Sequence, residues 1–240
     1  MAKVDIIVLS FNHWDVTQEF LSRLFSNTFV DIFRLVMIDN GSTDETQVEL
    51  KKFLSDKKDV IMHMNNYNSG IISGRNTGWE IISADPSEFV MFLDNDQMVI
   101  NGWLEHHLGF LERHNADIVG VEAWRMNDMF FPVERVQLSS RPFSYVGCGG
   151  MLIKSDVIKK IGLFDSIFNP CYFEDPDFIF RAYDAGYKIC WNKSAKIVHM
   201  PHQTLGNMPK TEQRERFLNS YNKFKNKWRN RKLPVFVQED

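Results

Sequence analysis

Short apolar runs that predict buried strands alternate with amphipathic patterns that predict helices, from the N-terminus to about residue 115. The run at residues 4–10 is rich in β-branched side chains, as is typical of a strand that is buried on both faces of a sheet. Comparable runs follow at residues 33–38, 60–64 and 89–93, with helical patterns between them. This alternation predicts an α/β fold with a Rossmann-like, mostly parallel central sheet flanked by helices.

The pattern becomes less regular in the rest of the chain. The elements predicted there are strands at 117–122, 146–153, 188–191 and 196–200, short helices at 155–161 and 174–185, and a loop with short strands at 124–144. A long polar and basic helix is predicted at residues 210–232. Its apolar positions, three or four apart, are Phe217, Tyr221, Phe224 and Trp228. We expect these aromatic side chains to pack on the body of the protein.

Composition excludes several classes of protein. The formal net charge of −3 argues against nucleic-acid binding through overall charge, so we expect no nucleic-acid partner. The cysteines Cys148, Cys171 and Cys190 show no CxxC spacing, which argues against a disulfide framework or a zinc site and suits a reducing compartment. The sequence has no apolar stretch of about 18 residues, and the run at residues 6–9 is too short for a signal-peptide core. We therefore expect a cytoplasmic protein.

Acidic residues directly follow two of the predicted strands. Asp39 comes after the strand at 33–38, and Asp94 and Asp96 come after the strand at 89–93. Because the carboxyl ends of strands in a parallel sheet border one ligand crevice, we expect both acidic turns on the same rim.

The sequence Asp94-Asn95-Asp96 is the strongest local signal for chemistry. Two carboxylates one residue apart at a strand end can share one Mg²⁺ or Mn²⁺ ion, because these cations prefer oxygen ligands and usually also hold substrate phosphates. The alternative is an acidic loop without a ligand, since Asp-x-Asp alone is a common pattern.

Asp39 allows two interpretations. Its carboxylate would accept hydrogen bonds from a base N–H or a ribose hydroxyl, or it would cap its own turn, and the residue alone favours the turn. A little further on, Ser42 and Glu45 have the spacing of a capping box, which predicts the start of the next helix.

The segment Glu174-Asp175-Pro176-Asp177 also allows two interpretations. If Asp175 faces the crevice, it would act as a general base toward a hydroxyl group. Alternatively, Asp175 caps the following helix, Pro176 opens its first turn and Asp177 complements the helix dipole. The local pattern alone favours the capping role, although one carboxylate can serve both.

Three further signals are weaker. His199 ends an apolar run and His202 follows, and either would complete a metal shell or contact a diphosphate, although a lone histidine is more often a polar edge residue. The run Gly147-Cys148-Gly149-Gly150 would let the backbone approach a sugar, or it marks a tight packing site or a bulge. Arg75 would pair with a nucleotide or phosphate, or it is a solvated helix charge.

In order and spacing, these segments together resemble glycosyltransferase family 2, whose members are inverting enzymes with the GT-A fold. The resemblance runs from Val4 to about Gly206. The segments that carry it are Ile-Ile-Val-Leu-Ser-Phe-Asn, Val-Met-Ile-Asp-Asn-Gly-Ser-Thr-Asp, Gly-Arg-Asn-Thr-Gly, Phe-Leu-Asp-Asn-Asp, Gly-Gly-Met-Leu-Ile-Lys, Ile-Gly-Leu-Phe-Asp, Phe-Glu-Asp-Pro-Asp-Phe and Lys-Ile-Val-His. It implies a GT-A fold with a C-terminal acceptor-side lobe and a terminal helix.

The resemblance also implies roles for individual residues. Asp175 would be the catalytic base, with Glu174 beside it to help bind the acceptor or the sugar. Asp96, Asp94 and His199 would hold a divalent cation, Mn²⁺ or Mg²⁺. The residues implied for nucleotide and donor binding are Ser10, Phe11, Asn12, Asp39, Arg75, Asp94, Asn95, Gly149 and Gly150.

The same resemblance implies boundaries within the chain. Residues 1–206 would form the glycosyltransferase domain, with a nucleotide-binding half at 1–115 and an acceptor half at 116–206, and residues 207–240 would form an amphipathic basic helix and tail. Such an enzyme would move a sugar from a nucleotide-diphosphate-sugar, with UDP the expected nucleotide, to a hydroxyl of a glycan, lipid-linked or protein acceptor. We expect it to act in glycan or polysaccharide biosynthesis.

Two other functions remain as alternatives. A nucleotidyltransferase that makes nucleotide-sugars would use a similar sheet and acidic site, but it would usually show a glycine-rich basic loop where this chain has Ser10-Phe11-Asn12-His13-Trp14. A non-catalytic nucleotide-sugar-binding scaffold would not need the acidic residues, all of which are present.

The basic end of the terminal helix suggests one more partner, an anionic membrane. Its basic residues are Lys223, Lys225, Lys227, Arg229, Arg231 and Lys232. Such a cluster would allow a peripheral contact with an anionic membrane at its inner face, although we prefer a solvated helix packed on the body.

Overall fold

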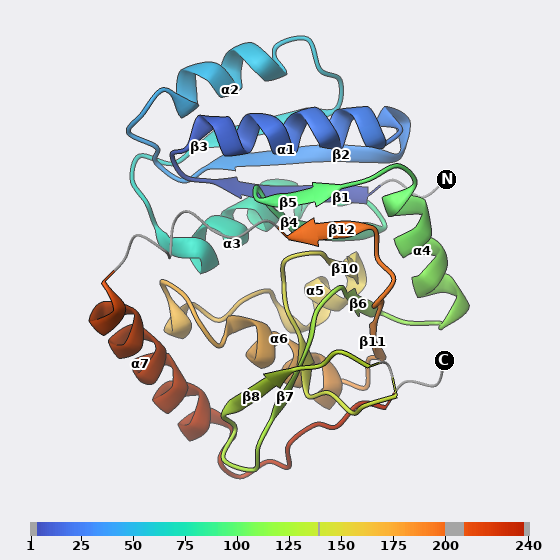
Figure 1. Ribbon diagram of the computed structural model, residues 1–240, viewed down its shortest axis with the longest axis vertical. Coiled ribbons are helices and arrows are strands. Elements are labelled where there is room, and N and C mark those ends of the chain that lie inside the picture. The colour runs from blue at the N-terminus through green and yellow to red at the C-terminus, as the bar shows by residue number, and fades with distance from the viewer. Residues whose placement is uncertain (1–3, 139, 200–208, 238–240) are drawn as a thin grey trace.

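A mixed seven-stranded sheet forms the centre of the protein. Its strands in chain order are β1 (Val4–Ser10), β2 (Phe33–Asp39), β3 (Val60–Met64), β4 (Phe89–Asp94), β6 (Ile118–Gly120), β10 (Met151–Lys154) and β11 (Ile189–Trp191). The computed structural model describes residues 4–138, 140–199 and 209–237, and within them the sheet has the order β11-β6-β10-β4-β1-β2-β3 (Figure 1). The predicted α/β fold with a mostly parallel sheet is confirmed.

Two small sheets and a set of helices surround this centre. The small sheets pair β5 (Gln97–Val99) with β12 (Ile197–His199), and β7 (Ala123–Met126) with β8 (Pro132–Arg135) and β9 (Tyr145–Val146). The α-helices are α1 (Trp14–Asn27), α2 (Thr46–Leu54), α3 (Gly70–Ile82), α4 (Trp103–Arg113), α5 (Ser155–Ile161), α6 (Glu174–Asp184) and α7 (Lys210–Trp228). Two 3₁₀ turns, η1 (Val30–Ile32) and η2 (Ser166–Phe168), complete the described elements.

Strands β1, β2 and β4 are buried on both faces, as their apolar runs predict, whereas the edge strand β3 is mostly half-buried. Apolar side chains of α1, α2 and α4 belong to the core cluster on one face, and those of α3, α5 and α6 belong to the cluster on the other. Helix α3 lies directly on β1 because it presents two glycines there. A Cβ atom on Gly74 would come within 2.5 Å of Leu9, and one on Gly78 within 2.5 Å of Ile7.

The carboxyl ends of the parallel strands meet at one edge of the sheet. In the register of the sheet, Ser10 at the end of β1 lies beside Asp39 at the end of β2, and Leu9 lies beside Asp94 at the end of β4. Both predicted acidic turns therefore lie on the same rim.

The predicted strand at 146–153 is wrong, because it is two strands in different sheets. β9 pairs with β7, whereas β10 runs antiparallel between β4 and β6. The chain changes sheets through residues 147–150, where Gly150 takes a left-handed backbone conformation with a φ of 84°. A regular strand cannot make this turn.

Two predicted helix caps are also wrong. Helix α2 begins after Glu45, which makes no capping hydrogen bond, and the Ser42 hydroxyl is instead engaged with Asp39 and the backbone N–H of Asn12. Helix α6 has Phe173 at its N-cap position, with a φ of 68°, so Asp175 lies inside the first turn. Its carboxylate is thereby free of the capping role and can face a neighbouring element.

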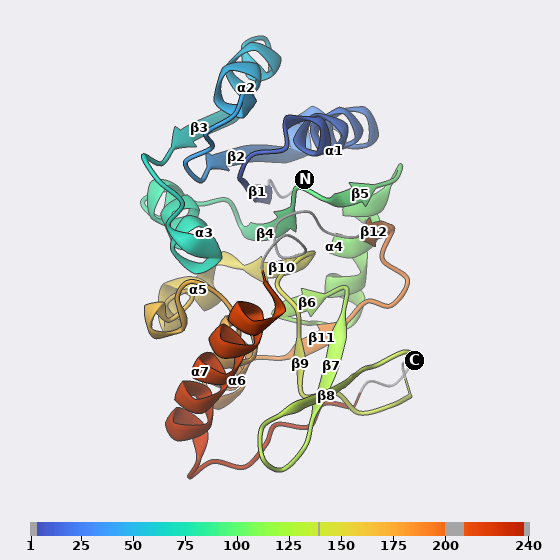
Figure 2. The ribbon, with the colours of Figure 1, turned by 60° about the vertical axis from the view of Figure 1, so that its left-hand side comes forward.

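Helix α7 packs on the body, as predicted from its aromatic positions. Phe224 and Trp228 are buried, and Phe217 and Tyr221 pack against the same core cluster. Figure 2 shows α7 beside α6, where the rings of Phe224 and Phe180 lie 5.2 Å apart. Within the described residues, none of the helices combines the length and apolar character needed to cross a membrane.

Candidate active site

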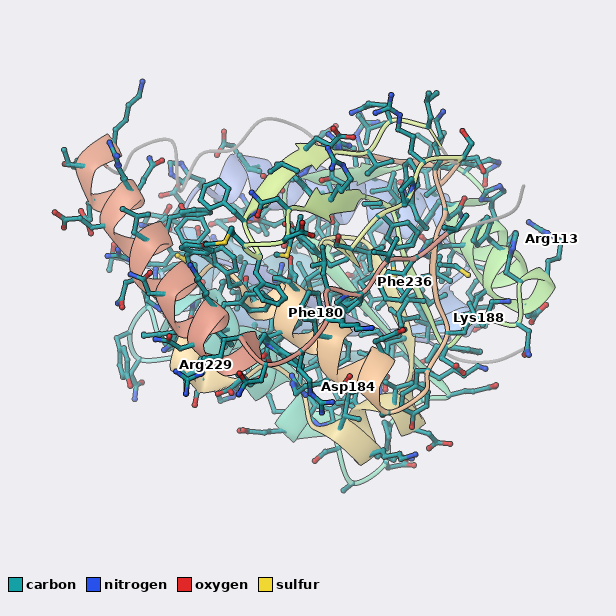
Figure 3. The ribbon with its side chains drawn as sticks, turned by 90° about the horizontal axis from the view of Figure 1, so that it is seen from below. Arg113, Phe180, Asp184, Lys188, Arg229 and Phe236 are labelled. Atoms are coloured by element: carbon teal, nitrogen blue, oxygen red, sulfur yellow. The ribbon has the colours of Figure 1, made fainter. Side chains whose placement is uncertain are left out.

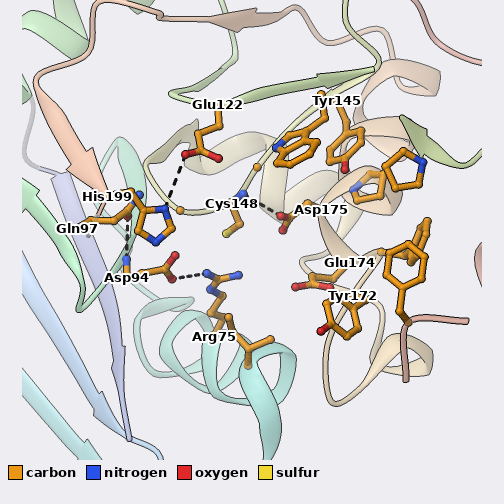
Figure 4. Close-up of a pocket in the computed structure, with 18 residues that line it drawn as sticks. Arg75, Asp94, Gln97, Glu122, Tyr145, Cys148, Tyr172, Glu174, Asp175 and His199 are labelled. Carbon is orange, nitrogen blue, oxygen red and sulfur yellow. Dashed lines mark hydrogen bonds and ion pairs between the residues drawn. The ribbon is translucent and has the colours of Figure 1, made fainter. Parts of the chain in front are cut away.

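A cavity of about 360 Å³ lies between the carboxyl edge of β4 and the first turn of α6 (Figure 4). Six of the predicted site residues line it: Arg75, Asp94, Gly149, Glu174, Asp175 and His199. They come from five separate segments of the chain, so the fold brings together what the sequence places up to 124 positions apart (199 − 75).

Three potential metal ligands gather at one side of this cavity. Asp94 ends β4, Asp96 follows it, and His199 is placed opposite Gln97 by the antiparallel pairing of β12 with β5. One ligand atom from each of Asp94, Asp96 and His199 lies within 4.8 Å of the other two. His202 lies outside the described residues.

The donor set fits the divalent cation that the sequence predicts. Carboxylate oxygens suit Mg²⁺ and Mn²⁺, and an imidazole nitrogen is a softer ligand that favours the transition metal. Hydrogen bonds to Asp96, at 3.2 Å, and to Glu122 raise the pKa of His199 to about 10. A metal ion would take the place of the proton that these carboxylates stabilise, since a ligating histidine must be neutral.

Arg75 fixes the first of these carboxylates. Its guanidinium donates a hydrogen bond of 2.6 Å to Asp94 Oδ1, and the arginine side chain is only 5% exposed. It projects from α3 beneath the cavity, with Phe164 under its guanidinium at 6.0 Å. The interpretation of Arg75 as a solvated helix charge is therefore wrong.

The segment 147–150 runs between the metal-ligand side and Asp175. A Cβ atom on Gly149 would lie 2.5 Å from Asp94 Oδ2, so the missing side chain makes room for that carboxylate. Gly150 does not line the cavity, because its left-handed backbone packs against Val121. On the other side, Gly147 lies close to Asp175.

Asp175 is held in place through one of its two oxygens. The backbone N–H of Cys148 donates a hydrogen bond of 3.0 Å to Asp175 Oδ2. Among the described residues, neither Asp175 Oδ1 nor the buried Glu174 Oε2 has a hydrogen-bond partner. Both residues line the cavity, and each of these buried oxygens lacks the partner that a bound hydroxyl group would supply.

The electrostatics of this carboxyl pair differ from those of exposed acids. Burial, and then the neighbouring Asp175, raise the pKa of Glu174 well above its ordinary value. Burial also raises the pKa of Asp175, against the opposing effect of Arg75. A carboxyl group with a raised pKa is a stronger base once it is ionised, which suits proton transfer.

The residues predicted to hold the nucleotide at the ends of β1 and β2 do not line this cavity. Hydrogen bonds join the loops after β1 and β2. Asn12 N–H donates to Ser42 Oγ at 2.7 Å, and Thr43 N–H donates to Asn12 Oδ1 at 2.8 Å. Asp39 is fully buried and accepts from Gly41 N–H, Ser42 N–H and Gln47. Asp39 therefore caps its own turn.

The nucleotide roles of Ser10, Phe11, Asn12 and Asp39 stay predictions. The same holds for Asn95, whose amide donates a hydrogen bond of 2.8 Å to Thr17 on α1. Asp96 is the residue of this turn that faces His199.

Several lining residues were not predicted from the sequence. Gln97 accepts a hydrogen bond from the backbone N–H of Asp94, and Glu122 pairs with Arg135 and His199. The aromatic lining residues missed are Trp124, Tyr145, Tyr172, Phe173 and Phe217. Only Gln97 gave a signal, as a polar residue at the start of a short apolar run; the others depend on long-range packing.

Comparison with known proteins agrees with this arrangement. A family model described as glycosyl transferase family 2 matches residues 5–178. The pre-mycofactocin glycosyltransferase of Mycobacterium tuberculosis is 26% identical over 186 residues, which cover 71% of this chain and 38% of that protein. The poly(ribitol-phosphate) beta-N-acetylglucosaminyltransferase TarS of Staphylococcus aureus is 24% identical over 133 residues, or 55% of this chain and 23% of TarS. This chain thus spans well under half the length of these relatives.

Solved structures show the same fold. GalNAc-T7 with UDP, GalNAc and Mn²⁺ matches with a TM-score of 0.76 at 14% identity, over 96% of this chain and 48% of that one. The mannosyltransferase PcManGT from Pyrobaculum calidifontis with GDP-Man and Mn²⁺ matches with a TM-score of 0.72 at 16% identity, over 97% and 66%. With the GT-A fold of these structures and a family model that covers most of the sheet and the cavity, the chain belongs to glycosyl transferase family 2.

Proposed function

We propose that this chain transfers a sugar from a nucleotide-diphosphate-sugar to an acceptor hydroxyl in a single, inverting displacement. One observation carries the proposal: two members of the potential metal-ligand set, Asp94 and His199, line the same cavity as Asp175, a carboxylate with an unpartnered oxygen. Group transfer between two bound substrates needs both kinds of group within one enclosed site.

The donor would bind on the side of Asp94, Asp96 and His199. These residues would hold Mn²⁺ or Mg²⁺, which when bound would neutralise negative charge on the departing diphosphate. Similar proteins support this assignment, since their structures contain UDP or GDP-Man together with Mn²⁺. We take UDP as the expected nucleotide.

The acceptor would bind on the side of Asp175. With Oδ2 held by Cys148 N–H, Oδ1 accepts the proton of the acceptor hydroxyl while that oxygen attacks the anomeric carbon. The bond from the anomeric carbon to the diphosphate oxygen breaks in the same step, which inverts the anomeric centre. Glu174 lies beside Asp175 and would bind the acceptor or the transferred sugar.

Substitution of the proposed base tests the mechanism. Asp175→Asn keeps the size of the side chain but removes its basicity, so turnover should fall by about 100-fold or more while the affinity for nucleotide stays within a factor of two to three. Single-turnover rates and calorimetric binding measure the two separately. Near-normal turnover would remove Asp175 from this role, and a product that retains the donor's anomeric configuration would refute inversion.

Nucleotide binding tests the function as a whole. We would titrate UDP, dTDP, GDP and CDP calorimetrically with Mn²⁺ and again with EDTA. We expect one nucleotide to bind, and only in the presence of the metal. Pyrophosphate release from a nucleoside triphosphate and a sugar phosphate would instead indicate a nucleotidyltransferase. Absence of binding by any nucleotide would indicate a degenerate protein or a donor site that forms only with the acceptor bound.

A further inference from the structure

The cavity has an aromatic wall on the side away from the metal ligands. Trp124 comes from β7, Tyr145 from β9, Tyr172 from the segment before α6, and Phe217 from α7. Figure 4 shows Tyr145 and Tyr172 on the side of Asp175 and Glu174, across the cavity from Asp94 and His199. All four side chains are partly exposed rather than sealed into the core. Their rings therefore present apolar surface to whatever enters the cavity.

Contacts behind the wall hold its rings in place. The Phe217 ring lies 5.6 Å from that of Tyr172, 5.2 Å from that of Phe173 and 5.6 Å from that of Phe131. Trp124 pairs in the sheet with Tyr145 on one side and Arg135 on the other. Because the surrounding residues fix these rings before a ligand binds, contact with them costs little side-chain entropy.

Charged groups near this wall select against an anionic ligand. Among the described residues that line the cavity, the cationic side chains are Arg75 and His199, and both already pair with carboxylates. Asp175 and Glu174, in contrast, keep oxygens without hydrogen-bond partners. A phosphate or carboxylate of a ligand would meet repulsion here, whereas hydroxyl groups would satisfy these oxygens.

We propose that Trp124, Tyr172 and Phe217 form an acceptor subsite for a neutral carbohydrate ring, an inference that rests on the proposed glycosyl transfer. A pyranose ring has an apolar face of C–H groups, which packs on an aromatic ring, and a rim of hydroxyl groups, which reach the carboxyl oxygens. An alkyl chain would leave those buried oxygens unsatisfied. The acceptor is thus a glycan rather than a polyol phosphate or a lipid tail.

Helix α7 contributes to the wall from outside the part of the chain that the family model matches. Phe217 lies outside residues 5–178, the part that the family model matches. The predicted terminal helix is therefore part of the cavity, and its aromatic residue contributes to the choice of acceptor.

Saturation-transfer NMR tests the subsite without any need for turnover. The probes are the neutral disaccharides lactose, cellobiose and N,N′-diacetylchitobiose. Ribitol 5-phosphate represents a polyol phosphate and hexanol represents a lipid tail, and each compound is measured with and without UDP and Mn²⁺. We expect saturation to reach the ring C–H protons of at least one neutral disaccharide. Transfer only to ribitol 5-phosphate or only to hexanol, or to none of the probes, would overturn the proposal.

Variants locate the contact. Trp124→Leu and Phe217→Leu keep apolar bulk behind the wall but remove the flat ring, so the affinity for the disaccharide should fall about tenfold. Leu218→Ala, the next position on α7 and 40% exposed, is the matched control and should leave that affinity unchanged. Equal affinity in all three variants would refute the aromatic subsite.

A separate readout distinguishes this inference from the proposed function. Calorimetric binding of UDP with Mn²⁺ should be the same in wild type, Trp124→Leu and Phe217→Leu, which also shows that the variants fold. If the wild-type protein binds no nucleotide, the result would count against glycosyl transfer. If it binds the nucleotide but no disaccharide, the result would count against the subsite alone.

Discussion

At the scale of single residues, the missing side chain of Gly149 matters as much as the carboxylate of Asp94. Asp94 Oδ2 occupies the space that a Cβ atom at position 149 would fill, while Oδ1 of the same carboxylate is held by Arg75. The orientation of this potential metal ligand therefore depends on a glycine and an arginine that come from different parts of the chain.

Gly149→Ala should weaken metal-dependent nucleotide binding. The new methyl group must push Asp94 out of its position, and disturbing the support of a metal ligand commonly costs about 10- to 100-fold in affinity. Gly147→Ala is the matched control, since its Cβ atom would meet nothing closer than Asp175 Oδ2 at 3.9 Å. Calorimetric titration of nucleotide with Mn²⁺ measures both. Unchanged affinity in Gly149→Ala would mean that Asp94 does not need this orientation.

Glu174→Gln should change how stability depends on pH. Because burial raises the pKa of Glu174 in the folded state above its unfolded value, the folded state binds the proton more tightly. Its contribution to stability is full below the unfolded pKa and is lost as the pH rises through the folded pKa, at roughly 1.4 kcal/mol for each unit of pKa difference. Urea unfolding should find Glu174→Gln more stable than wild type at about pH 8, with the difference shrinking toward about pH 5. Parallel pH profiles for the two proteins would contradict this.

At the scale of elements, the contacts of α7 explain why its end is rich in basic residues. Lys227 pairs with Asp165 at 2.7 Å and with the buried Asp177 at 2.6 Å, and Trp228 donates a hydrogen bond to the same Asp177. Figure 3 shows this end of the molecule, where Asp184 at the end of α6 pairs with Arg231. Much of the positive charge near the end of α7 thus serves packing against the body.

The peripheral membrane contact stays a prediction. The residues that still support it are the exposed Arg229 and Lys232 and the half-buried Lys225, because Lys223, Lys227 and Arg231 contact other parts of the protein. Sedimentation with anionic vesicles would test it.

Phe224→Ala should destabilise the fold by about 3–5 kcal/mol, the usual cost of truncating a fully buried phenylalanine. Its ring is enclosed by the rings of Phe130, Phe168, Phe173, Phe180 and Trp228. Leu218→Ala on the exposed side of the helix should stay within about 0.5 kcal/mol of wild type. Urea unfolding followed by circular dichroism measures both, and equal midpoints would show that α7 is dispensable for the fold.

The sequence predicts elements whose identity is local and misses features set by distant partners. Apolar runs located β1 to β4 to within a residue, and in β1, β2 and β4 burial on both faces leaves little choice of side chain. The break between β9 and β10 could not be predicted, because the two strands join different sheets. The residue at the start of α6 was missed for a similar reason, as Phe173 is fixed by α7 rather than by capping chemistry.

The candidate site follows the same rule. Asp94, Asp96 and Asp175 stand in recognisable motifs, so they could be predicted residue by residue. Glu122, Trp124 and Phe217 belong to no motif, and they reach the cavity only through the packing of the small sheet and α7.

At the scale of the whole molecule, the predicted halves share one sheet. β10 lies after the predicted boundary at residue 115 but pairs with β4, which lies before it, as well as with β6. The boundary between residues 206 and 207 lies outside the described residues. The halves are therefore unlike two domains joined by a linker, since separating them would break a central sheet.

Residues 4–199 should therefore unfold as one cooperative unit. We expect urea transitions followed by tryptophan fluorescence and by far-ultraviolet circular dichroism to coincide. A fragment of residues 1–115 should lack a cooperative transition, because the edge of β4 that pairs with β10 would be left bare. Two separate transitions in the full chain, or a stably folded fragment, would show that the halves are independent.

Hydrogen bonds among Asn12, Ser42, Thr43 and Asp39 join the loops after β1 and β2. The chain gives up the conformational freedom of these loops when it folds, not when it meets a ligand. A nucleotide that docks against them would bind with little further loss of backbone entropy, and the heat-capacity change of binding would follow from the apolar surface covered alone. Part of the affinity predicted for a nucleotide at this edge would thus be set during folding.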